Sequence, residues 1–98
     1  MITEVIKDQL PTGSKKSFIK FSANWCQPCK VYAKNFEKFA ENNNEYNFYD
    51  VDIEENRQLA IQFGVRSIPT TILIDENGKE IDRMMGVQTE NTLKLMDK

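Results

Sequence analysis

The chain contains no histidine, and it has only two cysteines, Cys26 and Cys29. Without histidine there is no Cys-His protease pair, no Ser-His-Asp triad and no histidine ligand for a metal. Two cysteines alone cannot complete the four ligands of a structural zinc site. Any chemistry must therefore come from cysteine, carboxylate, lysine or tyrosine side chains, and we expect no metal or other cofactor.

The sequence also lacks an excess of charge and any long apolar run. Its 13 Lys and Arg residues are interspersed with 15 Asp and Glu residues, giving a net charge of −2. There is no basic cluster to bind phosphates, so we do not expect nucleic-acid binding. No stretch approaches the ~20 apolar residues of a membrane span. The first four residues have neither the basic nor the apolar region of a secretory signal, so we expect a cytoplasmic protein that does not bind a membrane.

The length of 98 residues and the 40% hydrophobic content indicate one domain, residues 1–98. Hydrophobic periodicity predicts helices over 3–10, from Cys29 to about residue 40, over 56–63 and after Thr89. Strands are predicted over 17–22, 46–53, 70–74 and 80–84. Asn77-Gly78 predicts a tight hairpin with both residues at positive φ. This order predicts an α/β fold with a mixed four-stranded sheet and helices on both faces.

Cys26 and Cys29 lie between the end of a predicted strand and the first turn of a predicted helix. Such a pair can also be half of a metal site, but the chain lacks the further ligands. It can also be a structural disulfide. So small a ring restricts the unfolded chain by only about 2 kcal/mol. At a helix start, unpaired N–H groups and the helix dipole stabilise a thiolate. We therefore interpret the pair as a redox-active disulfide, with Cys26 as the exposed attacking thiol and Cys29 as the buried resolving thiol.

Three segments resemble the thioredoxin family. Trp25-Cys26-Gln27-Pro28-Cys29-Lys30 is similar to its active-site motif, usually Trp-Cys-Gly-Pro-Cys-Lys, with Gln27 in place of glycine. The segment 64–70 resembles the second signature, in which the proline, here Pro69, is cis and faces the disulfide. Met85-Gly86-Val87 resembles a third loop. The resemblance runs from about Ser17 to the C-terminus and implies a thioredoxin fold whose first strand is missing or rudimentary here.

The resemblance implies a monomeric protein-disulfide reductase that works by dithiol–disulfide exchange. Cys26 would attack disulfides in protein substrates, Cys29 would resolve the mixed disulfide, and an NADPH-dependent thioredoxin reductase would restore the dithiol. The substrate-facing surface that it implies consists of Trp25, Gln27, Pro28, Ile53, Ile68, Pro69 and Gly86. The alternative for Ile53 and Ile68 is ordinary core packing, and for Pro69 a simple proline at a strand start.

Lys20 and Asp50 depart from the family pattern. Thioredoxins usually bury an Asp six residues before the first cysteine, with a Lys beside it on the next strand, and here these charges are exchanged. In the family the buried acid is assigned as the base for the second cysteine, so Lys20 is a candidate to accept the proton of Cys29. Alternatively, Lys20 extends to solvent and Asp50 is a surface acid. Burial is favoured because Lys20 stands among apolar residues, and lysine is rarely buried without a partner.

Two other functions are compatible with this fold. An oxidase or isomerase usually works in an oxidising compartment and often has histidine between its cysteines, and this chain has neither a secretory signal nor histidine. A binding module with idle thiols is opposed by the intact residues Trp25, Cys26, Pro28, Cys29 and Pro69. Reduction of protein disulfides is therefore the function we expect.

Overall fold

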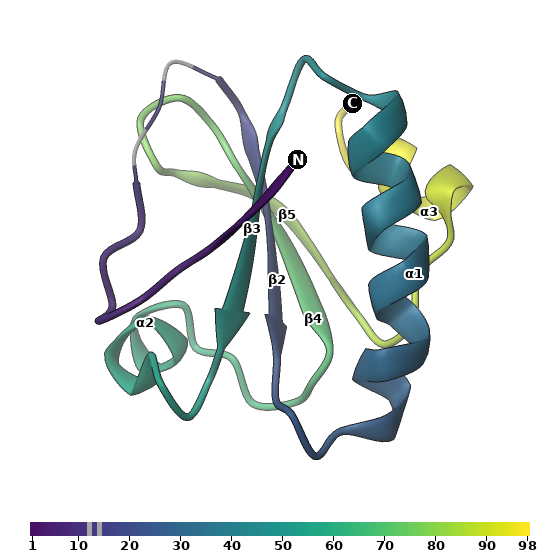
Figure 1. Cartoon of the computed structure of the whole chain (residues 1–98). Coiled ribbons are helices and arrows are strands. Elements are labelled where there is room, and N and C mark those ends of the chain that lie inside the picture. The colour runs from purple at the N-terminus through teal and green to yellow at the C-terminus, as the bar shows by residue number, and fades with distance from the viewer. Residues whose placement is uncertain (12, 14) are drawn as a thin grey trace.

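The computed structural model describes residues 1–11, 13 and 15–98. In this part of the chain there are five strands and three helices, and Figure 1 shows their arrangement. In chain order they are β1 (Ile2–Glu4), β2 (Ser17–Ser22), α1 (Gln27–Asn42), β3 (Asn47–Asp52), α2 (Arg57–Gln62), β4 (Thr70–Ile74), β5 (Glu80–Met85) and α3 (Glu90–Lys94).

The strands form one mixed sheet in the order β1-β3-β2-β4-β5. β1, β3 and β2 run parallel, whereas β4 is antiparallel to both β2 and β5. Helices α1 and α3 cover one face of the sheet and α2 covers the other (Figure 1). The predicted α/β class, with a mixed sheet and helices on both faces, is confirmed.

Two apolar cores hold the helices to the sheet. The core under α1 and α3 is rich in aromatic rings, and Phe18 of β2 lies at its centre, stacked on Phe48 and edge-on to Phe39. The core under α2 is mostly aliphatic, and α2 contributes Leu59 to it. Because both faces of β2 are covered, its side chains are buried on both sides, as its unbroken apolar sequence predicts.

The N-terminal segment is a strand, so the helix predicted over 3–10 is wrong. β1 pairs in parallel with β3, matching Ile2 to Phe48, and the N–H of Val5 continues the ladder to the carbonyl of Asp50. Its helical pattern was weak, and a short edge strand gains its stability from this pairing instead. The sheet therefore has five strands in the described residues, not four, and the first strand is three residues long.

The hairpin between β4 and β5 also differs from the prediction. Gly78 has φ 85°, but Asn77 is not in the left-handed region. The Asp75 carboxylate accepts hydrogen bonds from the N–H groups of Asn77 and Lys79, both at 2.9 Å. This side-chain anchor favours a three-residue loop with one left-handed glycine over the two-residue turn that Asn-Gly suggests.

No helix within residues 1–11, 13 and 15–98 is long and apolar enough to cross a membrane.

Candidate active site

The two cysteines lie at the junction of β2 and α1, where they form a disulfide. α1 begins at Gln27, two residues before the apolar pattern that starts at Cys29. Cys26 is the N-cap residue, with extended backbone angles of φ −87° and ψ 110°, and its Sγ accepts the N–H of Cys29 at 3.2 Å. A sulfur therefore occupies the capping position that an oxygen of Ser, Thr or Asp fills in most helices.

The surroundings of Cys26 favour a negative charge on its sulfur. The first turn of α1 contains no acidic residue, and Lys30 is exposed at its end. The positive end of the helix dipole and the N–H of Cys29 both point at Cys26, and each stabilises a thiolate. The helix start thus gives the two sulfurs different environments.

The expected difference in exposure between the two cysteines is not found in the disulfide form. Cys26 is 5% exposed and Cys29 is 4% exposed. Both pack in a small apolar cluster with Ala23, against which Ile53 and Ile68 are placed from two other loops. The helix N–H groups, not accessibility, therefore distinguish Cys26 from Cys29 in this state.

The loop before β4 places both a backbone carbonyl and an apolar side chain next to the disulfide. The Ile68–Pro69 peptide bond is cis, as the resemblance implies. The carbonyl oxygen of Ile68 lies 4.0 Å from Cys26 Sγ, and Pro69 is buried. Ile68 is half-buried and contacts the disulfide cluster, so it belongs both to the core and to this surface.

The loop after β5 completes the ring of segments around the disulfide. Gly86, with φ 90°, donates its N–H to the carbonyl of Pro69 at 2.8 Å. Trp25, Gln27 and Pro28 are exposed on the other side, and Trp25 has 63% of its surface free. The predicted surface residues are thus contributed by four segments, the last of which is joined to the others through Pro69.

The sequence analysis placed Met85 in the third loop without listing it as a surface residue, and it missed Gln88. Met85 is 67% exposed beside Gly86 and extends the apolar surface. Gln88 is buried, donates from Nε2 to the carbonyl of Met85 at 3.1 Å, and accepts the side chain of Asn35 of α1 at its own carbonyl. An apolar residue before the glycine was a usable signal for Met85, whereas nothing in the sequence marks Gln88 as buried.

Lys20 and Asp50 are register partners on β2 and β3. Lys20 Nζ lies 3.7 Å from Asp50 Oδ2, with side-chain exposures of 6% and 33%, respectively. The ammonium also lies 5.4 Å from the centre of the Phe36 ring, and Ser22 Oγ donates to Asp50 Oδ1 at 3.3 Å. Lys20 is therefore buried and paired and does not extend to solvent, whereas Asp50 reaches the surface.

The pair lies beside Cys29. Lys20, Asp50 and Cys29 line one open cavity of about 180 Å³ next to the first turn of α1. Cys29 therefore shares an open, water-accessible cavity with the titratable Lys20–Asp50 pair.

A second polar cluster, also missed from the sequence, holds the loop that carries Ile53. Asn56 is completely buried and donates from Nδ2 to the carbonyls of Val5 and Asp52. Its Oδ1 accepts the N–H of Asp8, whose carboxylate in turn accepts the N–H of Leu59 in the first turn of α2. The N-terminal segment therefore caps α2, and an Asn or Asp in a loop gives no sequence signal for such distant contacts.

Within residues 1–11, 13 and 15–98, no group of three or more His, Cys, Asp or Glu side chains is arranged to hold a metal ion.

Comparison with known proteins identifies the family. The family model described as Thioredoxin matches residues 3–98. Thioredoxin of Mycoplasmoides gallisepticum is 37% identical over 87 residues, which are 89% of this chain and 86% of that protein. Thioredoxin-2 of Saccharomyces cerevisiae is 40% identical over 77 residues, covering 79% of this chain and 73% of that protein.

Solved structures agree with these sequence matches. The crystal structure of Malassezia sympodialis thioredoxin superposes with a TM-score of 0.84 at 30% identity, covering 97% of this chain and 89% of that one. The Fasciola hepatica thioredoxin structure gives a TM-score of 0.78, covering 87% and 81%. With a family model that spans nearly the whole chain and a disulfide at the start of α1, this chain belongs to the thioredoxin family of protein-disulfide oxidoreductases.

Proposed function

We propose that this chain reduces protein disulfides in the cytoplasm, with Cys26 as the attacking thiol and Cys29 as the resolving thiol. The observation that carries the proposal is the hydrogen bond from the N–H of Cys29 to Cys26 Sγ at the N-terminus of α1. In the reduced protein this donor and the helix dipole stabilise a thiolate on Cys26, and the thiolate is the form that attacks disulfides.

The exchange balances in two steps. The Cys26 thiolate attacks one sulfur of the substrate disulfide, a mixed disulfide forms, and the other substrate sulfur leaves as a thiolate. Cys29 then loses its proton and attacks Cys26 Sγ, and the second substrate sulfur leaves. The substrate gains two electrons and this chain becomes the Cys26–Cys29 disulfide.

The substrate chain would lie on the surface formed by the four segments around the disulfide. Its exposed rim is formed by Trp25, Gln27 and Pro28, and its floor by the half-buried Ile53 and Ile68. Pro69 and Gly86 would hold the backbone of the floor through their 2.8 Å hydrogen bond. A protein substrate thus meets a mostly apolar surface with backbone groups at its centre, suited to disulfides of many sequences.

Lys20 and Asp50 would take up the proton that leaves Cys29 in the second step. Lys20 first passes one proton to Asp50, 3.7 Å away, which releases it to water, and the amine that results accepts the thiol proton of Cys29. Support comes from the cavity that the three residues share and from the partial exposure of Asp50. After this transfer, Lys20 carries the proton that left Cys29.

The oxidised protein must be reduced again by an external donor. Members of this family typically receive electrons from a thioredoxin reductase, and we propose an NADPH-dependent one as the partner. We further propose that the chain works as a single-domain monomer, with proteins containing disulfides as substrates and neither nucleic acid nor membrane as a partner.

Insulin reduction tests the cysteine assignments. With dithiothreitol as the electron source, the wild-type protein should accelerate the precipitation of insulin chains, and Cys26→Ser should abolish the acceleration. Cys29→Ser should instead accumulate a mixed disulfide with the substrate, visible by non-reducing mass spectrometry. If Cys26→Ser retains activity, or if Cys26→Ser is the variant that traps substrate, the roles are wrong. An inactive wild type would favour a binding module, and a strongly oxidising potential would favour an oxidase.

The second exchange step tests Lys20. Stopped-flow measurement should show that Lys20→Met slows release of the mixed disulfide while its formation is unchanged. Lys34→Met, which removes an exposed lysine from α1, is the matched control for loss of one charge. If Lys20→Met releases the mixed disulfide as fast as Lys34→Met does, the Lys20–Asp50 pair has only a structural role.

A further inference from the structure

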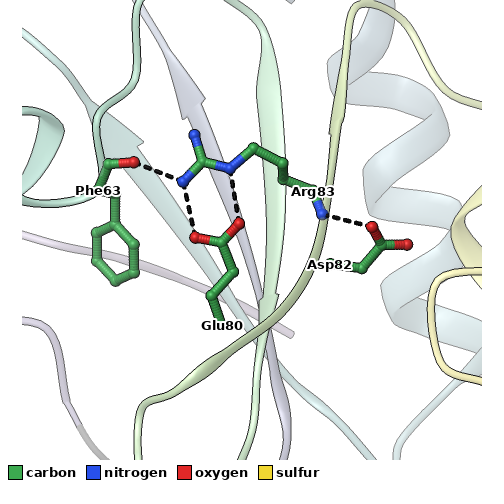
Figure 2. A network of polar contacts seen from close by, with 4 residues as sticks. All are labelled: Phe63, Glu80, Asp82 and Arg83. Carbon is green, nitrogen blue, oxygen red and sulfur yellow. Dashed lines mark hydrogen bonds and ion pairs between the residues drawn. The ribbon is translucent and has the colours of Figure 1, made fainter.

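Arg83 connects the edge strand β5 to the end of α2. In β5 it is the register partner of Ile72, which belongs to the core on the α2 side of the sheet. Its Nε and Nη2 donate to the two carboxylate oxygens of Glu80, both at 2.7 Å. Nη2 also donates to the carbonyl oxygen of Phe63 at 2.5 Å, and Figure 2 shows the guanidinium lying between these two acceptors.

The Phe63 carbonyl is where α2 ends. The last turn is closed by the N–H of Gly64 to the carbonyl of Ile61 and by the N–H of Val65 to the carbonyl of Ala60, with Gly64 at φ 65°. α2 has no basic residue in its own last turn. Arg83 supplies that positive charge from another strand, at the negative end of the helix dipole.

From Phe63 the chain runs directly to the active site. Residues 64, 66 and 67 are exposed, and Val65 alone among residues 64–67 packs against the core on the α2 side. Its far end carries Ile68, whose carbonyl lies 4.0 Å from Cys26 Sγ, and Pro69, whose carbonyl accepts the N–H of Gly86. β5 and the residue that follows it therefore hold the segment at both ends, through the Arg83 side chain at its start and the Gly86 backbone at its end.

We propose that Arg83 is a positioning residue for protein substrates of the thiol exchange. By fixing the Phe63 carbonyl, it sets where the Ile68 backbone lies relative to Cys26, and a peptide joined to Cys26 must pass along that backbone. Glu80 holds the guanidinium at the correct angle through two parallel hydrogen bonds. The proposal rests on the proposed reductase activity, and it concerns recognition of a polypeptide, not the reactivity of Cys26.

Comparison of a protein disulfide with a small one tests this assignment. Arg83→Met should raise KM for insulin about fivefold, the equivalent of one modest hydrogen bond, with kcat within twofold of wild type. Its rate with 2-hydroxyethyl disulfide, which has no polypeptide to align, should stay within twofold. Arg83→Lys keeps one donor for Phe63 and should recover part of the loss. Lys79→Met, an exposed cation on the same hairpin, is the control for net charge and should match wild type.

The outcomes separate this proposal from the proposed function. If wild type reduces neither substrate, the reductase activity fails. If wild type is active and Arg83→Met leaves KM for insulin unchanged, or impairs both disulfides equally, Arg83 does not position the substrate. Should Arg83→Met fail to fold, Arg83→Lys and Glu80→Gln still test the proposal, because each weakens the contact between residue 83 and the Phe63 carbonyl without removing it. In either variant, an insulin KM equal to that of wild type would overturn the proposal.

Discussion

The two partners of the Lys20–Asp50 pair should contribute unequally to stability because they are buried unequally. Asp50→Asn leaves the Lys20 ammonium, 6% exposed, beside the Phe36 ring without its counter-charge. Lys20→Met leaves the Asp50 carboxylate, 33% exposed, with the Ser22 hydroxyl and water as hydrogen-bond donors. We therefore expect Asp50→Asn to destabilise the protein far more than Lys20→Met.

The size of each effect follows from burial. Removing one partner of a fully buried pair typically costs about 3–5 kcal/mol, and partial access of water to this pair reduces the expected loss for Asp50→Asn to about 2–3 kcal/mol. For Lys20→Met we expect a change of less than about 1 kcal/mol, because methionine fills a similar volume and its sulfur packs well on an aromatic ring. In a domain of this size, a loss of about 2 kcal/mol lowers Tm by roughly 8–16 °C.

Urea unfolding measures this asymmetry. Circular dichroism at pH 7 should be recorded for wild type, both single variants and the double variant, all as the disulfide form. The double variant should resemble Lys20→Met, since no buried charge remains in it to be left unpaired. If Lys20→Met costs as much as Asp50→Asn, or if the two losses simply add, the burial argument is wrong.

Three further changes probe features outside the redox site. Lys7 has φ 54° in a turn without glycine, so Lys7→Gly should raise the free energy of unfolding by up to about 1 kcal/mol, measured by urea titration. Asp97 accepts the Tyr46 hydroxyl, which holds its pKa below the ordinary 3.8. A carboxyl with a lowered pKa stabilises the fold above its ordinary pKa and loses that effect as the pH falls through its folded value. Asp97→Asn should therefore lower the free energy of unfolding by about 1 kcal/mol at pH 7. In a pH series, the difference in stability between wild type and this variant should shrink below pH 3.8. Tyr32 shares a buried 2.6 Å hydrogen bond with Thr71, so Tyr32→Phe should cost about 1–2 kcal/mol in thermal unfolding, and adding Thr71→Val should recover most of it.

The parts of the fold that were predictable are those whose signal is local and strong. β2 and β4 are short apolar runs between turn residues, and α1 has a long apolar face, so burial and period agree. The N-terminal strand was not predictable in this way, because a three-residue edge strand is stabilised by pairing with β3, which lies more than 40 positions away in the sequence. The hairpin failed for a similar reason on a smaller scale, since Asp75 fixes its loop through side-chain bonds that Asn-Gly alone does not predict.

The site divides in the same way. Cys26 and Cys29 were predictable because their spacing and their place at a helix start belong to one short segment. The residues that hold α2 in place were not, because Asp8 and Arg83 reach it from opposite ends of the chain. Either residue, taken from the sequence, is an ordinary surface charge in a polar loop or an edge strand. What makes each a positioning group is the α2 backbone group that it meets, and that is a property of the topology.

Lys20 was predictable as a paired residue because a charged side chain does not fit its apolar sequence surroundings. A cation in the middle of an apolar strand demands an anion, because burial of an unpaired ammonium is costly. The resemblance to the family pattern placed Asp50 beside Lys20 on the next strand, and the register Lys20↔Asp50 agrees. The sequence could not predict how the burial is shared between the two. That depends on α1 covering Lys20 with Phe36, while Asp50 lines one surface cavity next to β1 and another next to the first turn of α1. In the proposed proton transfer, the same unequal burial would let Asp50 exchange protons with water while Lys20 faces the cavity that it shares with Cys29.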